Sequence, residues 1–274
     1  MDILGIIAGG GKFPIMLARA AKKKGLKVIA IAHEGETEPA LSNEVDHIVW
    51  IKLGQFGRLI NSFKKTGVKK AVMAGTISKK KMFGTVFPDL KGLSIMSKLV
   101  FFHDDGILST VANELYKEGI EVVSATVYLP ELLAPKGCLT ARKPSRDEKK
   151  DIRFGWYMAK EIGRLDIGQC IVVKKKTVLA VEAIEGTDET IIRGGTLAKK
   201  GAVVVKVSKP MQDLRFDLPT VGLNTIKTMD KVNASVLAIE AGKTLIFDKD
   251  RMIAFADSRG ISIVSIKDIT NECR

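Results

Sequence analysis

The stretch that decides the fold is ILGIIAGGGKFP, residues 3–14. Its first six residues are apolar, which is typical of a buried strand, and the glycines of 9–11 predict a tight turn. Pro14 suits the first turn of a helix, because the first amide groups of a helix have no partner within it. That helix is expected to end at Gly25. A strand, a glycine turn and a helix in this order indicate an α/β domain.

Apolar runs and helical segments continue to alternate up to about residue 130. Strands separated by helical crossovers imply a parallel sheet that is covered on both faces. We therefore predict that residues 1–130 form a Rossmann-like domain. Its further strands are expected over 26–32, 46–51, 70–74 and 122–126, and its further helices over 55–66, 94–102 and 104–117.

Residues 130–145, PELLAPKGCLTARKPS, contain three prolines, and within them residues 131–145 are the best candidate for a linker. Ser145 and Glu148 then have the spacing of a capping box, which predicts a helix from that point to about Gly163. The polar tip of residues 174–176 separates two apolar runs and predicts a hairpin. Residues 146–274 are thus expected to form a second α/β domain with its own sheet, and two such halves favour a cleft that closes.

The composition narrows the classes of function. The chain has 274 residues with 44 Lys and Arg against 31 Asp and Glu, a formal charge of +13 that attracts anions or reflects a lysine-rich solvated surface. Aromatic residues make up only 6%, which argues against binding of nucleic acid by base stacking. Three scattered cysteines and the absence of paired histidines or a GxSxG pattern give no support to a zinc site or a serine triad. No apolar run approaches the roughly 18 residues of a spanning helix, so we expect a cytoplasmic protein.

The glycine turn is the first place where chemistry is expected. Backbone amides at a helix N-terminus bind anions, and Lys12 adds a positive charge. Pro14 occupies the position where the dinucleotide fingerprint needs glycine, and Phe13 occupies the Ser or Thr position of a P-loop. A tight turn without a ligand is the alternative interpretation.

Carboxylates follow two apolar strands in the second half. The segment VEAIEGTDE, residues 181–189, is rich in acids, and Asp213, Arg215 and Asp217 lie two residues apart in KPMQDLRFDLPTVG. In an extended segment these three side chains would share a face, where two acids and an arginine suit Mg²⁺ beside a phosphate. The alternative is a solvated acidic loop and a surface salt bridge. The acids after His103, including Asp105, are further candidates for substrate binding. The alternative is that they only cap the helix that begins there.

Six blocks of the sequence resemble the LpxI family. They cover nearly the whole chain in the family's order, and the most specific lie in its second half. The blocks are GIIAGGGKFP at 5–14, AGTISKKK from Ala74, HDDGILSTV from His103, EIGRLDIGQ from Glu161, AVEAIEGTDE from Ala180 and KPMQDLRFDLPTVG from Lys209.

The resemblance implies Mg²⁺-dependent hydrolysis of UDP-2,3-diacylglucosamine to UMP and 2,3-diacylglucosamine 1-phosphate, a step of lipid A assembly, in a cleft between two domains. It implies that Asp217, which matches the aspartate of the family's DLPTxG motif, acts in catalysis. With it we expect Arg215 and Asp213 in catalysis, and metal binding by Asp217 with Asp213 or Asp188. Substrate contacts are expected from Gly9, Gly10, Gly11, Lys12, Thr76, Asp105, Glu185, Gly186, Thr187, Asp188, Gln212 and Thr220.

The resemblance favours attack by water on the phosphorus atom that bears the sugar, and attack on the phosphorus that bears uridine is the alternative. Two other classes of function stay open from the residues alone. One is a protein that holds a nucleotide or lipid-linked sugar without cleaving it. The other is a nicotinamide-dependent oxidoreductase, which the proline at position 14 disfavours. Release of UMP from the sugar nucleotide is expected only from the hydrolase, so it distinguishes the hydrolase from the binding protein and the oxidoreductase.

A lipid substrate predicts weak association with the anionic inner membrane surface. Lys79, Lys80 and Lys81 precede the apolar pairs Met82-Phe83 and Val86-Phe87, and this stretch is the expected contact. A solvated loop with its phenylalanines turned inward is the alternative. A homodimer is the expected assembly if the chain associates with itself.

Overall fold

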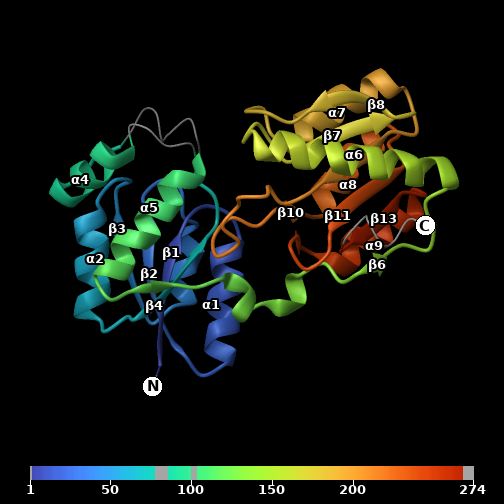
Figure 1. Cartoon of the computed structure of the whole chain (residues 1–274). Coiled ribbons are helices and arrows are strands. Elements are labelled where there is room, and N and C mark those ends of the chain that lie inside the picture. Colours follow the sequence, from blue (N-terminus) through green and yellow to red (C-terminus); the bar gives the residue numbers. More distant parts are fainter. Residues whose placement is uncertain (1, 78–85, 100–103, 268–274) are drawn as a thin grey trace. The chain divides into compact units, whose positions relative to one another are not determined.

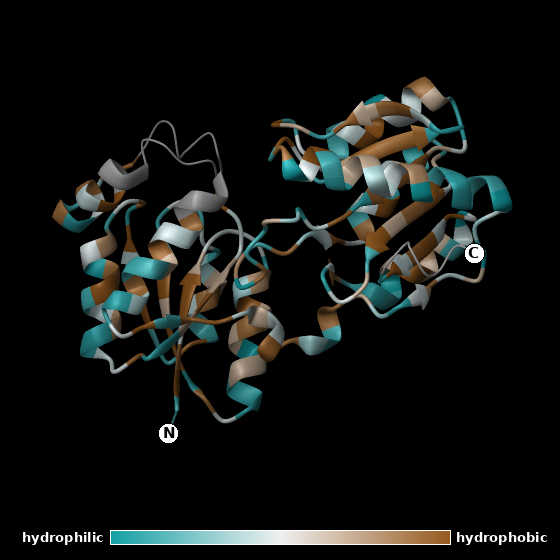
Figure 2. Cartoon of the chain, viewed as in Figure 1, coloured by the Kyte–Doolittle hydropathy of each residue, from teal (hydrophilic) through white to brown (hydrophobic). Residues whose placement is uncertain are grey.

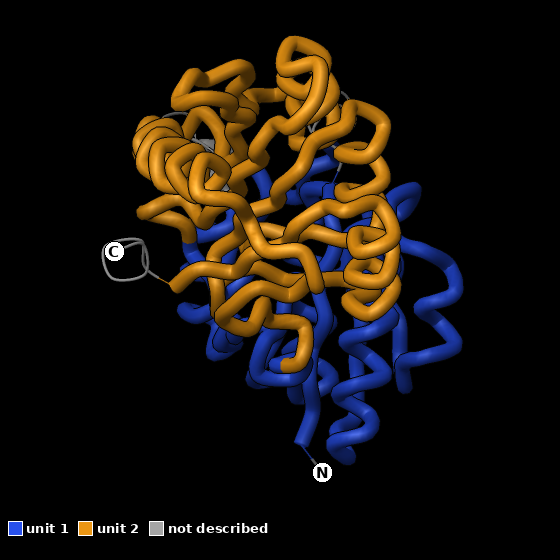
Figure 3. The backbone as a smooth tube through the Cα atoms, turned by 90° about the vertical axis from the view of Figure 1, so that its right-hand side faces the viewer, with its two compact units in different colours: residues 1–130, 213–217 blue, residues 131–212, 218–274 orange. Residues whose placement is uncertain are grey.

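A computed structural model describes residues 2–77, 86–99 and 104–267 (Figure 1). Two compact units make up the chain (Figure 3). Unit 1 comprises residues 1–130 together with Asp213–Asp217, and unit 2 comprises Glu131–Gln212 and 218–274. Each unit has its own main sheet, so the predicted α/β class with two sheets is confirmed. The described residues include no helix long and apolar enough to cross a membrane.

Unit 1 contains a five-stranded sheet in the order β3-β2-β1-β4-β5, and every pairing is parallel. Most residues of the central strands β1, β2 and β4 are apolar and buried, and these strands are largely brown in Figure 2. The strands are β1 (Ile3–Ala8), β2 (Lys27–His33), β3 (His47–Ile51), β4 (Lys70–Ala74) and β5 (Glu121–Val122).

The helices of unit 1 pack their apolar stripes on this sheet. One core cluster joins side chains of α2, α4 and α5 to the strands, and α1 packs against β1, β2 and β4. These helices are α1 (Phe13–Lys23), α2 (Phe56–Lys65), α4 (Leu90–Leu99) and α5 (Asp104–Lys117), with 3-10 turns at Pro39–Asn43 and Ala125–Val127.

Two predicted boundaries in unit 1 were wrong. Helix α4 begins at Leu90 rather than at residue 94, because the Asp89 carboxylate accepts the amide of Gly92 and so caps the helix four residues earlier. Strand β5 is only two residues long, because Ser124 caps the 3-10 turn that follows.

Unit 2 contains a six-stranded sheet in the order β6-β13-β11-β9-β7-β8. Strands β9, β11 and β13 are parallel, whereas β7 pairs antiparallel with both β8 and β9. The predicted hairpin is β7–β8, with Lys175 and Lys176 in positive φ at its tip. The strands are β6 (Gly137–Cys138), β7 (Cys170–Lys174), β8 (Thr177–Val181), β9 (Val203–Lys206), β11 (Val236–Glu240) and β13 (Ser262–Ile266); β10 (Thr220–Val221) and β12 (Leu245–Ile246) form a separate parallel pair.

The two faces of this sheet are covered by different helices. Alternate residues of β7 show the division: Ile171 and Val173 share a core cluster with α6, whereas Cys170 and Val172 share one with α7, α8 and α9. The capping box predicted at the start of α6 is confirmed by the hydrogen bonds between Ser145 and Glu148. The helices are α6 (Arg146–Arg164), α7 (Thr187–Ala198), α8 (Leu223–Lys231) and α9 (Lys249–Ser258).

Residues 131–145, expected to form a linker, are structured as part of unit 2. After a 3-10 turn at Pro130–Leu132, the amide of Ala134 donates to the carbonyl of Thr244, and β6 pairs with β13. Conversely, Asp213–Asp217 follows β9 of unit 2 in the chain but belongs to unit 1.

Candidate functional site

In unit 1 the order of the strands reverses between β1 and β4, the position where open α/β sheets bind ligands at the carboxyl ends of their strands. The glycine turn follows β1, and Gly75 and Thr76 follow β4. The amide of Gly9 donates to the carbonyl of Ala74 at 2.8 Å, and that of Gly10 donates to the carbonyl of Thr76 at 2.7 Å. The two strand ends are therefore joined directly.

Glycine is required for this close approach. A Cβ atom on Gly9 would lie 2.6 Å from the carbonyl oxygen of Thr76, and one on Gly75 would lie 2.6 Å from that of Gly10. The amides of Gly9 and Gly10 donate to the carbonyls of Ala74 and Thr76, so both residues join the ends of β1 and β4. Gly11 differs, since it has φ of +82° and open space where a Cβ would stand. Lys12 follows it as the N-cap residue of α1.

His33 and Thr37 lie at and just beyond the carboxyl end of β2, next to β1. They were not identified as site residues from the sequence. The His33 Nδ1 lies 2.9 Å from the carbonyl oxygen of Ala8, and the hydroxyl of Thr37 donates to the same oxygen at 2.6 Å. Burial lowers the pKa of His33, which favours the neutral ring. These bonds hold β1 and β2 together at the carboxyl edge of the sheet.

Asp213, Arg215 and Asp217 lie in a turn, so the prediction of an extended segment with a common face was wrong. The amide of Asp217 donates to the carbonyl of Asp213 at 3.0 Å, and the amide of Arg215 donates to the Asp213 carboxylate at 3.0 Å. An aspartate that accepts an amide two residues further along the chain stabilises a turn in place of a strand.

Arg215 holds both carboxylate oxygens of Asp213. Its Nη2 donates to Oδ2 at 2.6 Å, and its Nε lies 3.0 Å from Oδ1 and 3.1 Å from Oδ2. The hydrogen bonds from Arg215 hold the pKa of Asp213 below its usual range. The guanidinium remains partly exposed, at 45% of its side chain, and can present its remaining N–H groups to a phosphate.

The rest of the turn attaches to unit 1. Phe216 packs against the core cluster formed by the sheet and α2, α4 and α5. The hydroxyl of Ser124, two residues beyond β5, donates to the carbonyl of Leu214 at 3.3 Å. Because Ser124 follows the carboxyl end of β5, the turn lies at the same edge of the sheet as the glycine turn.

Thr76 is exposed beside the glycine turn, and Asp105 lies in the first turn of α5. The structure thus brings Gly9, Gly10 and Thr76 together, and it pairs Asp213 with Arg215.

In unit 2 the predicted residues follow β8 and meet a buried lysine. Glu182 and Lys206 are each 7% exposed. The hydroxyl of Thr187 donates to Glu182 Oε1 at 2.6 Å, and the Lys206 ammonium donates to Thr187 Oγ1 at 3.0 Å and to the carbonyl of Thr220 at 2.9 Å. Lys206 therefore joins two predicted substrate-binding residues, Thr187 and Thr220. The sequence feature that could have identified Lys206 is a lysine at the end of an apolar strand, in AVVVK at residues 202–206.

The remaining acids after β8 lie at the start of α7. Arg193 Nη2 donates to Glu185 Oε1 at 2.6 Å, and the amide of Ala183 donates to Glu185 Oε2 at 3.1 Å. Bonds from its own amide and from Arg193 hold the pKa of Glu185 below its usual range. Gly186, with φ of +87°, is the N-cap residue, and Asp188 lies in the first turn, where an acid favours the helix dipole.

A second buried network lies at the carboxyl ends of β9 and β11. Glu240 Oε2 accepts from Lys160 Nζ at 2.7 Å, from the amide of Ser208 at 2.9 Å and from its hydroxyl at 2.7 Å. Burial alone raises the pKa of Glu240, but the bonds from Lys160 and Ser208 outweigh it and hold that pKa below its usual value. Burial lowers the pKa of Lys160.

The bonds to Glu240 hold Ser208, and the next residue, Lys209, is held as well. Lys209 Nζ is paired with Asp166 at 2.6 Å, and the amide of Lys209 donates to Gln212 Oε1 at 2.9 Å. Gln212 thus helps to shape the turn that precedes the catalytic candidates.

The donor chemistry of the predicted metal ligands suits Mg²⁺, which needs one or two carboxylates when a substrate phosphate supplies further oxygens. Among the described residues, no three His, Cys, Asp or Glu side chains are grouped as a metal site. Asp213 forms a bidentate ion pair with Arg215. The carboxylate of Asp217 lies in the turn assigned to unit 1, and that of Asp188 lies in the first turn of α7.

Comparison with known proteins places both parts of the chain in one family. Residues 3–132 match the model of the LpxI N-terminal domain, and residues 135–264 match that of the LpxI C-terminal domain. A curated relative, UDP-2,3-diacylglucosamine pyrophosphatase LpxI of Caulobacter vibrioides, is 34% identical over 97% of this chain and 98% of its own length.

Solved structures give only weak likenesses. N5-carboxyaminoimidazole ribonucleotide synthetase from Thermotoga maritima has a TM-score of 0.28 and 16% identity, over 66% of this chain and 42% of its own. The biotin carboxylase subunit of pyruvate carboxylase has a TM-score of 0.27 and 15% identity, over 66% of this chain and 36% of its own. Neither likeness bears on the function of this chain.

Proposed function

The chain belongs to the LpxI family, and we propose that it hydrolyses the pyrophosphate of UDP-2,3-diacylglucosamine to UMP and 2,3-diacylglucosamine 1-phosphate in lipid A biosynthesis. The observation that carries this proposal is the match over 97% of the chain with UDP-2,3-diacylglucosamine pyrophosphatase LpxI of Caulobacter vibrioides. The turn that holds Asp217 lies within the matched residues of the C-terminal domain model.

In this reaction a water oxygen forms a bond to the phosphorus that bears the sugar, and the bond from that phosphorus to the bridging oxygen breaks. The bridging oxygen leaves with UMP, and the proton of the water passes to solvent or to a carboxylate. Arg215, which is held by Asp213, is our candidate for binding a phosphate oxygen. Asp217, four residues along the same turn, is our candidate for orienting the water.

We further propose that Mg²⁺ binds through Asp217, with Asp188 as a second candidate. When bound, the ion would offset negative charge on the phosphate oxygens and lower the pKa of a bound water. The residues themselves supply carboxylate oxygens for the ion and a guanidinium for the phosphate, which is the set of groups expected at a pyrophosphate site.

Further substrate contacts are assigned by the same proposal. The N-terminus of α7, which follows the N-cap residue Gly186 and begins at Thr187, presents amide groups that can bind an anion. Lys206 fixes Thr187 and Thr220, so it positions these contacts without needing to touch the substrate. A cytoplasmic location and weak association with the inner membrane complete the proposal.

Release of UMP from UDP-2,3-diacylglucosamine by the purified full chain with Mg²⁺ tests the function. Stoichiometric UMP and 2,3-diacylglucosamine 1-phosphate are expected, and the reaction should stop when EDTA is added. Binding of the sugar nucleotide without UMP would instead identify a binding protein. In ¹⁸O-water the label is expected in the lipid phosphate, and label in UMP would place the attack on the other phosphorus.

A further inference from the structure

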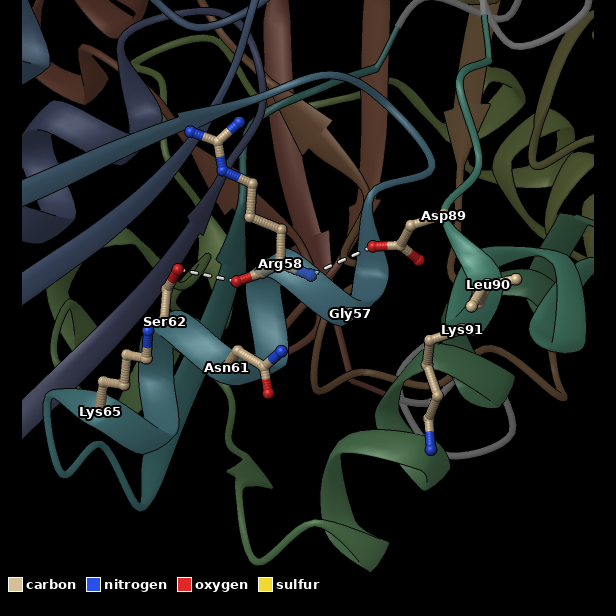
Figure 4. A pocket seen from close by; sticks show the side chains of 8 residues that line it. All are labelled: Gly57, Arg58, Asn61, Ser62, Lys65, Asp89, Leu90 and Lys91. Atoms are coloured by element: carbon tan, nitrogen blue, oxygen red, sulfur yellow. Dashed lines mark hydrogen bonds between the residues drawn. The ribbon is translucent and has the colours of Figure 1, made fainter.

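A groove on unit 1 runs between α2 and the start of α4 (Figure 4). Its volume is about 610 Å³, and its lining includes Arg58, Asn61 and Lys65 of α2 with Leu90 and Lys91 of α4. Both helices begin at the carboxyl edge of the sheet, because α2 follows β3 and the segment before α4 follows β4. The groove therefore starts at the edge that carries the proposed site residues of unit 1.

The charge of this groove is positive. Asp89 also lines it, but its carboxylate accepts the amides of Gly92 at 2.8 Å and Arg58 at 3.1 Å. Lys91 is paired with Glu118 at 2.9 Å. Within the described parts of the chain, neither the guanidinium of Arg58 nor the ammonium of Lys65 forms an ion pair with a carboxylate. Two cations are thus available to an anionic partner.

Large apolar side chains are exposed beside these cations. Phe87 is 51% exposed, Leu90 is 87% exposed and Leu93 is 52% exposed. Leu90 and Leu93 are three residues apart on α4 and so lie on one side of the helix. Leu90 also lines the groove, which links the apolar side chains to the cations. Single exposed apolar residues are ordinary, but three within seven residues beside a basic groove indicate a binding surface.

The fold holds this surface in place. The amide of Phe87 donates to the carbonyl of Leu53 at 2.9 Å, and the Lys52 ammonium lies 4.7 Å from the centre of the Phe87 ring. Gly92 packs so closely on Gly54 that a Cβ would meet its carbonyl oxygen. The start of α4 is therefore fixed to the loop after β3, and the apolar side chains point outward from a fixed base.

We propose that Arg58, Lys65, Phe87, Leu90 and Leu93 form a docking surface for an anionic phospholipid bilayer. Cations beside exposed apolar side chains fit the headgroup layer, where lysine and arginine meet phosphates and apolar groups enter the acyl boundary. This deepens the proposed function, on which it rests, because the proposed substrate carries acyl chains. Residues 79–81, predicted from the sequence as part of the membrane contact, lie outside the described residues, and the proposal does not rest on them.

Flotation of the full chain with vesicles tests the proposal. Binding is expected to vesicles of phosphatidylcholine mixed with phosphatidylglycerol, to be weak with phosphatidylcholine alone, and to decrease as salt rises. The double variants Leu90→Gln/Leu93→Gln and Arg58→Gln/Lys65→Gln should each weaken binding about tenfold or more. These side chains are at the surface, so both variants should fold, and circular dichroism checks this.

Matched control variants change the same residue types on unit 2. Ile192→Gln/Leu197→Gln alters exposed apolar side chains of α7, and Lys227→Gln/Lys231→Gln removes two exposed lysines of α8. Both controls should bind vesicles like the unchanged chain. The proposal is overturned if the chain does not bind mixed vesicles, if the controls lose as much binding as the groove variants, or if the groove binds phosphate or nucleic acid but no vesicle.

The same variants separate this proposal from the proposed function. UMP release from a water-soluble, short-chain form of the substrate should be unchanged in the groove variants, whereas release from substrate embedded in vesicles should fall with the binding. Binding to substrate-free vesicles needs no hydrolysis. A chain that binds vesicles through the groove but releases no UMP would therefore contradict the proposed function alone.

Discussion

Two acidic segments, residues 182–188 after β8 and 213–217 after β9, look alike in sequence and differ in the structure. Glu182 is buried and joined through Thr187 to Lys206 inside unit 2. Asp213 lies in a partly exposed turn that packs its Phe216 in unit 1 and holds an exposed arginine. An acid after an apolar strand can thus be buried inside the fold or lie in a partly exposed turn, and its partners differ accordingly.

The largest effect on this comparison is expected at Asp217. Asp217→Asn should lower kcat/KM about a thousandfold, because it removes a carboxylate proposed to orient water and hold the metal. The melting temperature should change little, in contrast to the variants of buried acids described next. Rates of UMP release under saturating Mg²⁺ measure the effect.

Asp250→Asn, in the first turn of α9, is the matched control and should keep full activity. Full turnover by Asp217→Asn would show that the exposed turn does not carry the chemistry.

A buried acid of unit 2 should affect stability instead. Glu240→Gln should lower the free energy of unfolding by about 2–3 kcal/mol, because it leaves the ammonium of Lys160 without its counter-charge. Urea unfolding measures this. Glu161→Gln, whose partner Arg164 is largely exposed, should cost less than about 0.5 kcal/mol.

The pH dependence has a definite sign. The folded pKa of Glu240 lies below its unfolded value, so its stabilisation is present above the unfolded pKa and is lost as pH falls through the folded pKa. The difference between the unchanged chain and Glu240→Gln should therefore shrink in acid below about pH 4. A difference that stays constant well below that pH would contradict the role of the charge.

Unit 1 offers a comparison between two neighbouring glycines. Gly9→Ala should destabilise unit 1 by about 2 kcal/mol, because its Cβ would meet the backbone of Thr76. Gly11→Ala meets nothing and should cost about 1 kcal/mol for its positive φ alone. Thermal unfolding of the two variants measures the difference, and equal losses would show that the β1–β4 junction is not tightly packed.

The smaller of the two effects on activity is expected at Asp213. Asp213→Asn weakens the fork that holds Arg215 and should lower kcat/KM about tenfold, or about 1.4 kcal/mol. The Mg²⁺ concentration that gives half the maximal rate should not change. A large rise in that concentration would restore Asp213 as a metal ligand.

Features set by neighbouring residues were predictable from the sequence. The capping box at Ser145 and Glu148, and the hairpin of residues 170–181, depend on groups a few positions apart. The start of α4 was missed although Asp89 was present, because an aspartate before a helical segment marks a cap only when its carboxylate reaches the amide of Gly92.

The sequence by itself determined the alternation of strands and helices, the two α/β halves and the blocks shared with the LpxI family. Apolar periodicity, glycine and proline encode these over short distances. Only the tertiary structure decided that Asp213–Asp217 folds with unit 1, and that Lys206 joins Thr187 to Thr220. Both outcomes depend on contacts between residues far apart in the chain, where burial determines which partner a charged or aromatic side chain finds.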